Sequence, residues 1–144
     1  MRLILLSLVS LGLTIGASAQ YLGFNGLTVR ASATMEDAGK KASPSDTDQL
    51  FAFSFADNTF THIILDGANV NSSQVYEIQE QSSYMDGDVT VYELDALSGL
   101  SGSVYHYELR IEDDGTLAGL YLTQPDGYRT KMTGGISELK TFKQ

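Results

Sequence analysis

Two histidines carry the side chains best suited to acid–base chemistry in this sequence. His106 lies two residues before Glu108, and residues i and i+2 of a strand share one face, so the carboxylate is placed to orient the imidazole. Such pairs are common on the solvated faces of strands, so we interpret His106 as a solvated residue with a cross-strand role. His62 stands between Thr61 and Ile63 in a β-rich run, which favours a hydrogen-bonded structural histidine.

Covalent catalysis would also need a nucleophile. The nearest candidate is the segment Gly99-Leu100-Ser101-Gly102-Ser103, which ends in Ser where a nucleophile elbow has Gly and lacks the strand-to-helix turn of that motif. We interpret it as a loop, predict no catalytic residue and expect a protein that is not an enzyme. An enzyme that uses a shaped cavity and one or two acids stays open as the alternative.

Acidic turns at residues 86–88 and 113–115 raise the question of calcium, which needs loops rich in oxygen ligands. From Asp86 the third ligand position falls on Thr90 and the required glycine position on Val91, and neither turn ends in the glutamate of a twelve-residue loop. Hairpin turns select Asp and Gly for backbone reasons in any case. With two histidines and no cysteine, the sequence predicts no metal site and no cofactor.

Charge excludes one class of partner. The 144 residues contain 18 acids and 9 Lys or Arg, and between Asp57 and Asp114 the only base is Arg110. We therefore predict no nucleic-acid partner. The four bases near the end of the chain are best interpreted as protection of an edge strand: Arg129, Lys131, Lys140 and Lys143.

The first 19 residues have the pattern of a secretory signal. Met1-Arg2 is a short positive region, 3–16 an apolar run and Ala17-Ser18-Ala19 a small-residue cleavage site. We predict cleavage after Ala19, a single domain over 20–144, no membrane anchor and a secreted or periplasmic location. The apolar run is shorter than the roughly 20 residues that a transmembrane helix needs. Without cysteine the mature domain has no disulfide and depends on its core.

The stretch from Ser103 to Met132 organises the rest of the chain. In its first strand four residues of one face, Tyr105, Tyr107, Leu109 and Ile111, alternate with charged residues of the other. An Asp-Asp-Gly turn and a Pro-Asp-Gly turn then join it to two more strands, which is typical of an antiparallel meander.

Further strands are expected over 27–35, 50–56, 60–65, 74–80 and 89–94. Residues 36–49 are expected to form a loop that includes at most one helical turn, and 69–73 and 98–102 two further loops. The Gly134-Gly135 pair is expected to separate a terminal segment that is strand or helix. The total is eight or nine strands in one all-β antiparallel meander, for which we rank a small barrel above a sandwich. In outline this resembles the architecture of lipocalins and fatty-acid-binding proteins, at the level of fold alone.

Alternation also predicts which side chains would line a barrel cavity: Phe51, Phe53, Tyr76, Tyr105, Tyr107 and Tyr121, with Val29, Ala31, Ala33 and Phe55 also facing inward. A mixture of small residues and phenols suits a small-molecule site. The most concrete prediction is therefore carriage of a small apolar or amphipathic molecule. The alternative is a structural or cell-surface interaction module whose interior is packed and whose protein partner the sequence does not name. Asn71-Ser72-Ser73 is a glycosylation sequon only in a eukaryotic source.

Overall fold

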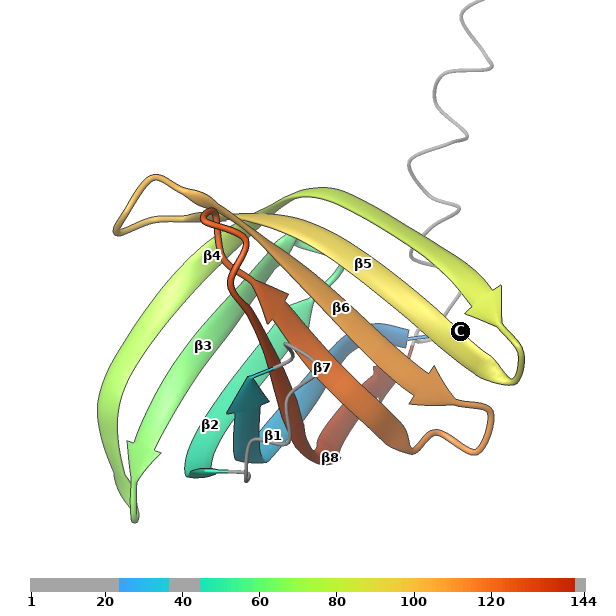
Figure 1. Cartoon of the computed structure of the whole chain (residues 1–144), viewed down its shortest axis with the longest axis horizontal. Helices are drawn as coiled ribbons and strands as arrows, with labels where there is room; N and C mark the ends of the chain where they lie inside the picture. Colours follow the sequence, from blue (N-terminus) through green and yellow to red (C-terminus); the bar gives the residue numbers. More distant parts are fainter. Residues whose placement is uncertain (1–23, 37–44, 142–144) are drawn as a thin grey trace, which may run out of the picture.

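The chain forms a closed antiparallel β-barrel (Figure 1). The structure is a computed structural model that describes residues 24–36 and 45–141. Eight strands follow one another around the barrel in chain order, so the prediction of an all-β meander barrel is confirmed. The strands are β1 (Phe24–Glu36), β2 (Ser45–Ser54), β3 (Thr59–Asp66), β4 (Asn69–Asp86), β5 (Val89–Ser98), β6 (Val104–Glu112), β7 (Leu117–Thr123) and β8 (Arg129–Thr141).

The predicted turns of the meander lie where the Asp-Gly sequences place them. Gly115, between β6 and β7, has φ +86°, and Gly127, between β7 and β8, has φ +89°, which is a backbone conformation that glycine adopts without steric cost. Each glycine follows an aspartate that bends the chain: Asp114 accepts the Thr116 amide at 2.8 Å and Asp126 accepts the Tyr128 amide at 2.9 Å. These short connections hold β6, β7 and β8 in consecutive antiparallel pairs.

The barrel closes where β1 pairs with β8 as well as with β2. Gly134 lies inside β8, not in a separator after the meander, because its neighbour β1 comes very close: a Cβ on Gly134 would stand 1.9 Å from the Arg30 carbonyl oxygen. The register of β1 shifts between Ala31 and Ala33. Ala33 consequently pairs with Thr133 while Thr34 pairs with buried Met132, so the predicted inward position of Ala33 is wrong.

Alternate residues of the strands build one apolar core inside the barrel. The fully buried side chains include members from most strands: Leu27, Val29, Phe51, Phe60, Tyr92, Leu94, Tyr107, Leu109 and Leu120. Burying a large apolar side chain contributes about 1.5–3 kcal/mol. A chain without cysteine therefore has a continuous source of stability in this core.

Strand β4 is longer than the sequence predicts and changes neighbours along its length. Residues 69–77 pair with β3, whereas residues 76–86 pair with β5. Residues 69–73, which are polar except for Val70, belong to this strand although a loop is predicted there, and all five are exposed. Their backbone pairs with β3 while both faces are open to solvent, so no apolar alternation marks them. Similarly, β2 begins at Ser45, inside the expected loop over 36–49. Residues 37–44 of that loop lie outside the described part.

Candidate functional site

Two regions hold the side chains that the sequence singles out: the interior of the barrel and the outer wall formed by β4, β5 and β6. In the interior, five of the six predicted cavity residues are found together: Phe51, Phe53, Tyr76, Tyr105 and Tyr107. Tyr76 stacks on Phe60 with ring centroids 4.7 Å apart, and Tyr105 meets Tyr76 edge-on at 5.9 Å. Aromatic pairs at these distances add about 0.5–1.5 kcal/mol beyond the area they bury.

The aromatic rings meet across the barrel axis. Phe51 on β2 and Tyr107 on β6 stand on opposite sides of the eight-stranded ring, yet their centroids are 6.3 Å apart. Phe60 on β3 approaches Tyr107 to 4.9 Å, and Phe55, directly after β2, approaches Tyr92 on β5 to 4.8 Å. Side chains of non-neighbouring strands therefore fill this part of the lumen. Phe60 and Tyr92 were not among the predicted cavity residues, although the alternation of β3 and β5 marks both positions.

The buried phenols are neutral and have polar partners. Burial raises the pKa of Tyr92 to about 12, and its hydroxyl donates to the Gln81 side-chain carbonyl. Burial also raises the pKa of Tyr107 far above its ordinary value, and adjacent Tyr76 adds to the rise. The Tyr76 hydroxyl donates to Gln74 Oε1 at 3.1 Å. Such phenols remain protonated at any physiological pH, so they act as hydrogen-bond donors and not as bases.

His62 is a structural histidine, as the sequence predicts. Its ring stacks on Phe51 with centroids 4.3 Å apart, and Nε2 donates to Gln49 Oε1 at 2.6 Å. Burial lowers the pKa of His62 to about 4, because the charged imidazolium would lose its hydration. The neutral ring is thus part of the interior wall.

Tyr121 does not line the interior, so its prediction as a cavity residue is wrong. Its neighbours Leu120 and Leu122 belong to the core, and Tyr121 pairs with Glu108 across β6 and β7 on the outer face. The Arg129 guanidinium lies 4.5 Å from the Tyr121 ring centroid and the Lys131 ammonium 5.6 Å from it. Cations over an aromatic face are attracted by its quadrupole, which accounts for this outward position.

Glu108 is held by two arginines and does not orient His106, with which it shares a strand face. Only 8 % of Glu108 is exposed, and its carboxylate accepts from Arg110 at 2.6 Å and from Arg129 at 3.3 Å. Arg110 also donates to Asp86 at 3.0 Å. These carboxylates hold the pKa of Arg110 above its ordinary value. The network therefore joins β6, β8 and the end of β4 across the outer wall.

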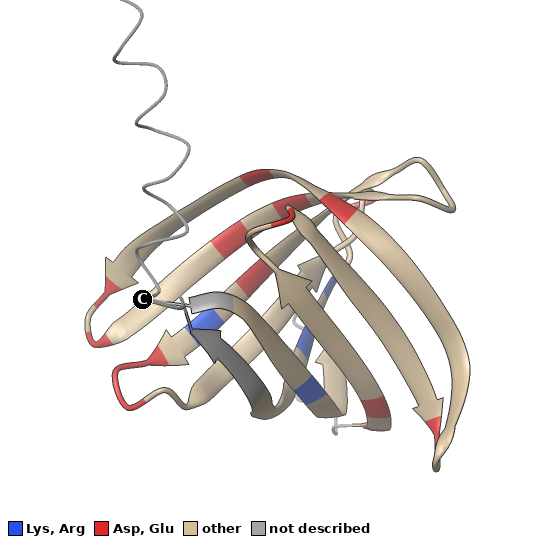
Figure 2. Ribbon diagram, turned by 180° about the vertical axis from the view of Figure 1, so that it is seen from behind, with Lys and Arg blue, Asp and Glu red and all other residues tan. Residues whose placement is uncertain are grey.

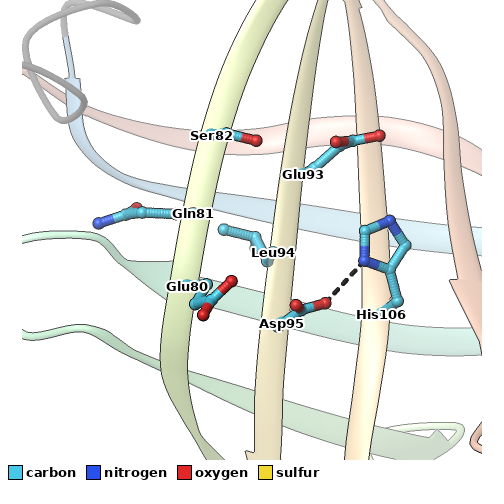
Figure 3. A pocket seen from close by; sticks show the side chains of 7 residues that line it. All are labelled: Glu80, Gln81, Ser82, Glu93, Leu94, Asp95 and His106. Atoms are coloured by element: carbon cyan, nitrogen blue, oxygen red, sulfur yellow. Dashed lines mark hydrogen bonds and ion pairs between the residues drawn. The ribbon is translucent and has the colours of Figure 1, made fainter.

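His106 instead pairs with Asp95, which lies directly opposite it on β5 (Figure 3). Asp95 Oδ1 stands 2.8 Å from His106 Nδ1. The pair borders an open groove of about 200 Å³ on the outer wall. The groove is lined by Glu80, Gln81, Ser82, Glu93, Leu94, Asp95 and His106. With three carboxylates and one imidazole, its chemistry is that of a site for cations or hydrogen-bond donors.

The outer surface is acidic around this groove. Acidic residues recur along the strands and at two neighbouring turns (Figure 2), namely those containing Asp86 and Asp88, and Asp113 and Asp114. Within the described residues no group of three or more His, Asp or Glu side chains is arranged to hold a metal ion. The same residues include no helix long and apolar enough to cross a membrane.

Other depressions lined by described residues also lie on the outer surface. One of about 620 Å³ runs over the junction of β3, β4 and β5, beside Val75 and Leu97. Another of about 390 Å³ follows the seam of β1 and β8, beside Arg30 and Gly134. Neither contains a group of catalytic side chains. Comparison of this chain with models of known protein families, with curated proteins and with solved structures finds no match.

Proposed function

We propose that this chain is an exported, non-enzymatic interaction module that uses the barrel as a rigid frame and binds through its outer surface. The observation that carries the proposal is the cluster in which Tyr107 meets Phe51, Phe60 and Tyr76 inside the barrel. An eight-stranded barrel has room either for side chains or for one small ligand. Rings that meet from opposite walls occupy that room.

Carriage of a small apolar or amphipathic molecule would require these rings to move apart. Phe60 and Tyr107 are both at most 1 % exposed and contact each other edge to face. A ligand at that level of the lumen would replace ring contacts that each stabilise the folded chain. This cost favours the packed interaction module over the carrier.

The arrangement of the outer groove supports a binding function and not a catalytic one. Ser82 on β4 is the hydroxyl in the same groove as His106 on β6, but β5 lies between their strands. Two strand spacings amount to about 10 Å, which is beyond hydrogen-bond reach. His106 therefore has a carboxylate partner but no adjacent nucleophile among the groove residues.

Export is part of the proposal and rests on the signal pattern of residues 1–19. N-terminal sequencing of protein collected outside the cytoplasm should begin at Gln20. The small-residue cleavage site supplies the matched variant: Ala19→Arg should block processing and leave Met1 or Arg2 at the N-terminus. A cytoplasmic chain that keeps Met1 without any substitution would contradict export.

Native mass spectrometry of the purified protein tests the packed interior. We expect the mass of the chain alone, and no small molecule in a denatured extract. Phe60→Ala should then gain binding of benzene, since apolar cavities of that size stay dry and accept such ligands, with Phe60→Leu as a smaller change that keeps the fold. A stoichiometric small molecule released from the unsubstituted protein would establish the carrier and overturn the module.

A further inference from the structure

Half of β4 is an open strand edge. Residues 80–86 pair with β5 on one side, while β3 reaches only as far as Glu77 on the other. Among the described residues no strand pairs with that second side, and Figure 1 shows this half of β4 as the rim of the barrel beyond β5. An open edge presents every second backbone N–H and C=O to solvent, which is a template for an added strand.

The protection of this edge is confined to its ends. The register with β5 shifts between Ile78 and Glu80, Asn58 of the β2–β3 turn accepts from Ile78 and Gln81, and Asp86 closes the segment. The segment 80–86 contains no proline, lysine or arginine, which are the residues that commonly block edge pairing. It also exposes two large apolar side chains, Tyr84 at 44 % and Met85 at 51 %. The edge thus offers both main-chain hydrogen bonds and apolar contacts.

The acidic groove lies beside this edge. Glu80 and Ser82 face outward next to Asp95 and Glu93, their partners on β5 (Figure 3). Within the described chain no ion pair reaches Glu80 or Glu93, whereas Asp95 is paired with His106. A strand added at the edge would place an alternate side chain beside Glu80, and a Lys or Arg opposite Ser82 is long enough to extend across β4 towards Glu93 on β5. Charge complementarity therefore selects Lys or Arg at those alternate positions.

We propose that the 80–86 edge of β4 binds an extended basic segment of a partner protein as an additional strand, with its cationic side chains over the Glu80 and Glu93 carboxylates. This inference rests on the proposed interaction function and names the class of its partner. The main chain supplies affinity, the groove selects positive charge, and Tyr84 receives an apolar side chain of the segment.

A second copy of this chain fits the edge less well. In the antiparallel register that pairs the whole segment with itself, Glu80 of one copy lies opposite Asp86 of the other, and this happens at both ends. Like charges directly opposite each other destabilise a strand pair. The 144-residue chain carries a net charge of −9, and removal of Arg2 with the signal makes each copy more acidic still, which adds long-range repulsion.

A synthetic peptide that alternates Lys with Val and Thr tests the inference by fluorescence anisotropy. We expect Glu80→Lys to weaken its binding about fivefold or more, since the substitution replaces an attraction by a repulsion. Asp66→Lys makes the same change of charge at the exposed end of β3 and should change affinity less than about twofold. A peptide with Glu in place of Lys should not bind.

A second peptide, N-methylated at alternate residues, separates strand addition from general attraction. It keeps its charge but cannot form the ladder, so we expect it to lose binding, and amides of 80–86 should gain hydrogen-exchange protection only with the unmodified peptide. Equal binding of both peptides, or equal loss in Asp66→Lys and Glu80→Lys, would overturn the inference. So would a dimer of the unsubstituted protein in native mass spectrometry whose 80–86 amides are protected from hydrogen exchange without any peptide. A ligand extracted from the lumen, by contrast, would count against the proposed function while leaving the edge result to stand on its own.

Discussion

A histidine and a tyrosine from the interior can be compared with a histidine and a tyrosine on the outer wall, where the same residue types are in opposite situations. Inside, His62 lies against Phe51 and Tyr107 against Phe60, and burial holds both side chains neutral. Outside, His106 meets Asp95, and Tyr121 lies beneath cations. The residue type is the same in each pair, so the environment decides whether the side chain acts as a packing unit or as part of a charged surface. Substitutions in the two regions should therefore differ in size and in their response to pH and salt.

The largest difference between the two regions should be seen when an aromatic ring is removed from the interior. Phe60→Ala should lower the free energy of unfolding by about 3–5 kcal/mol, because the cluster cannot close over the lost ring. Val70→Ala on the exposed part of β4 is the control and should change it by less than about 0.5 kcal/mol. Urea unfolding followed by circular dichroism measures both. A small effect at Phe60 would show that the interior is loose.

Acid should act on the interior histidine. The pKa of His62 is lowered to about 4 from 6.5, so the unfolded chain takes up the proton first. The contribution of neutral His62 to the free energy of unfolding is complete above pH 6.5 and is lost as the pH falls towards 4. The free energy of unfolding should fall by about 2 kcal/mol over this range, after allowance for the partial exposure of His62. His62→Gln should remove this part of the pH dependence between pH 6.5 and 4, while His106→Gln should keep it. Equal slopes in all three proteins would contradict the burial of His62.

The stability contributions of the outer ion-pair network can be separated by comparing two carboxylates that both accept from Arg110. Glu108→Gln should cost about 1–2 kcal/mol, because Glu108 is almost buried between two guanidinium groups. Asp86→Asn should cost at most about 0.5 kcal/mol, since the Asp86 side chain is 60 % exposed. Denaturation measured at low and at high salt should show that salt reduces the effect of Asp86→Asn more than that of Glu108→Gln. Equal costs would mean that burial does not distinguish the two carboxylates.

The smallest expected effect concerns Tyr121. Tyr121→Leu removes the ring beneath Arg129 and Lys131 and should lower the unfolding free energy by about 0.5–1 kcal/mol. Tyr121→Phe keeps the ring and should be neutral in the same unfolding measurement. A loss as large as that of Phe60→Ala would place Tyr121 in the interior after all.

The sequence predicts the fold well where each strand has one buried and one solvated face. Phe51 and Phe53 on β2, Phe55 directly after it, and Tyr105 and Tyr107 on β6 follow that alternation and lie in or against the core. Tyr121 escapes it because Leu120, Tyr121 and Leu122 are consecutive large residues, so only the pairing with β6 and β8 decides which face is inside.

The parts of the site that sequence reasoning missed depend on contacts between strands. Glu108 is the local neighbour of His106 along the chain, but residues two apart on a strand are farther from each other than directly opposed residues. Asp95 occupies the opposed position on β5, and its identity follows only from the register of β5 and β6. The open edge of β4 likewise follows from where β3 stops pairing, which no local pattern records.

The seam of β1 and β8 sets the order in which this molecule can be completed. The Ser32 hydroxyl donates to the Thr133 carbonyl, across 101 positions of the chain. Contacts of such long sequence separation form late, since a large loop must close before they contribute. When the chain is synthesised, with the N-terminus first, one side of β1 therefore stays unpaired until residues 129–141 are available. During that interval the chain is a curved open sheet with two unpaired edge strands. Folding of this barrel is therefore exposed to aggregation until its last strand pairs with β1.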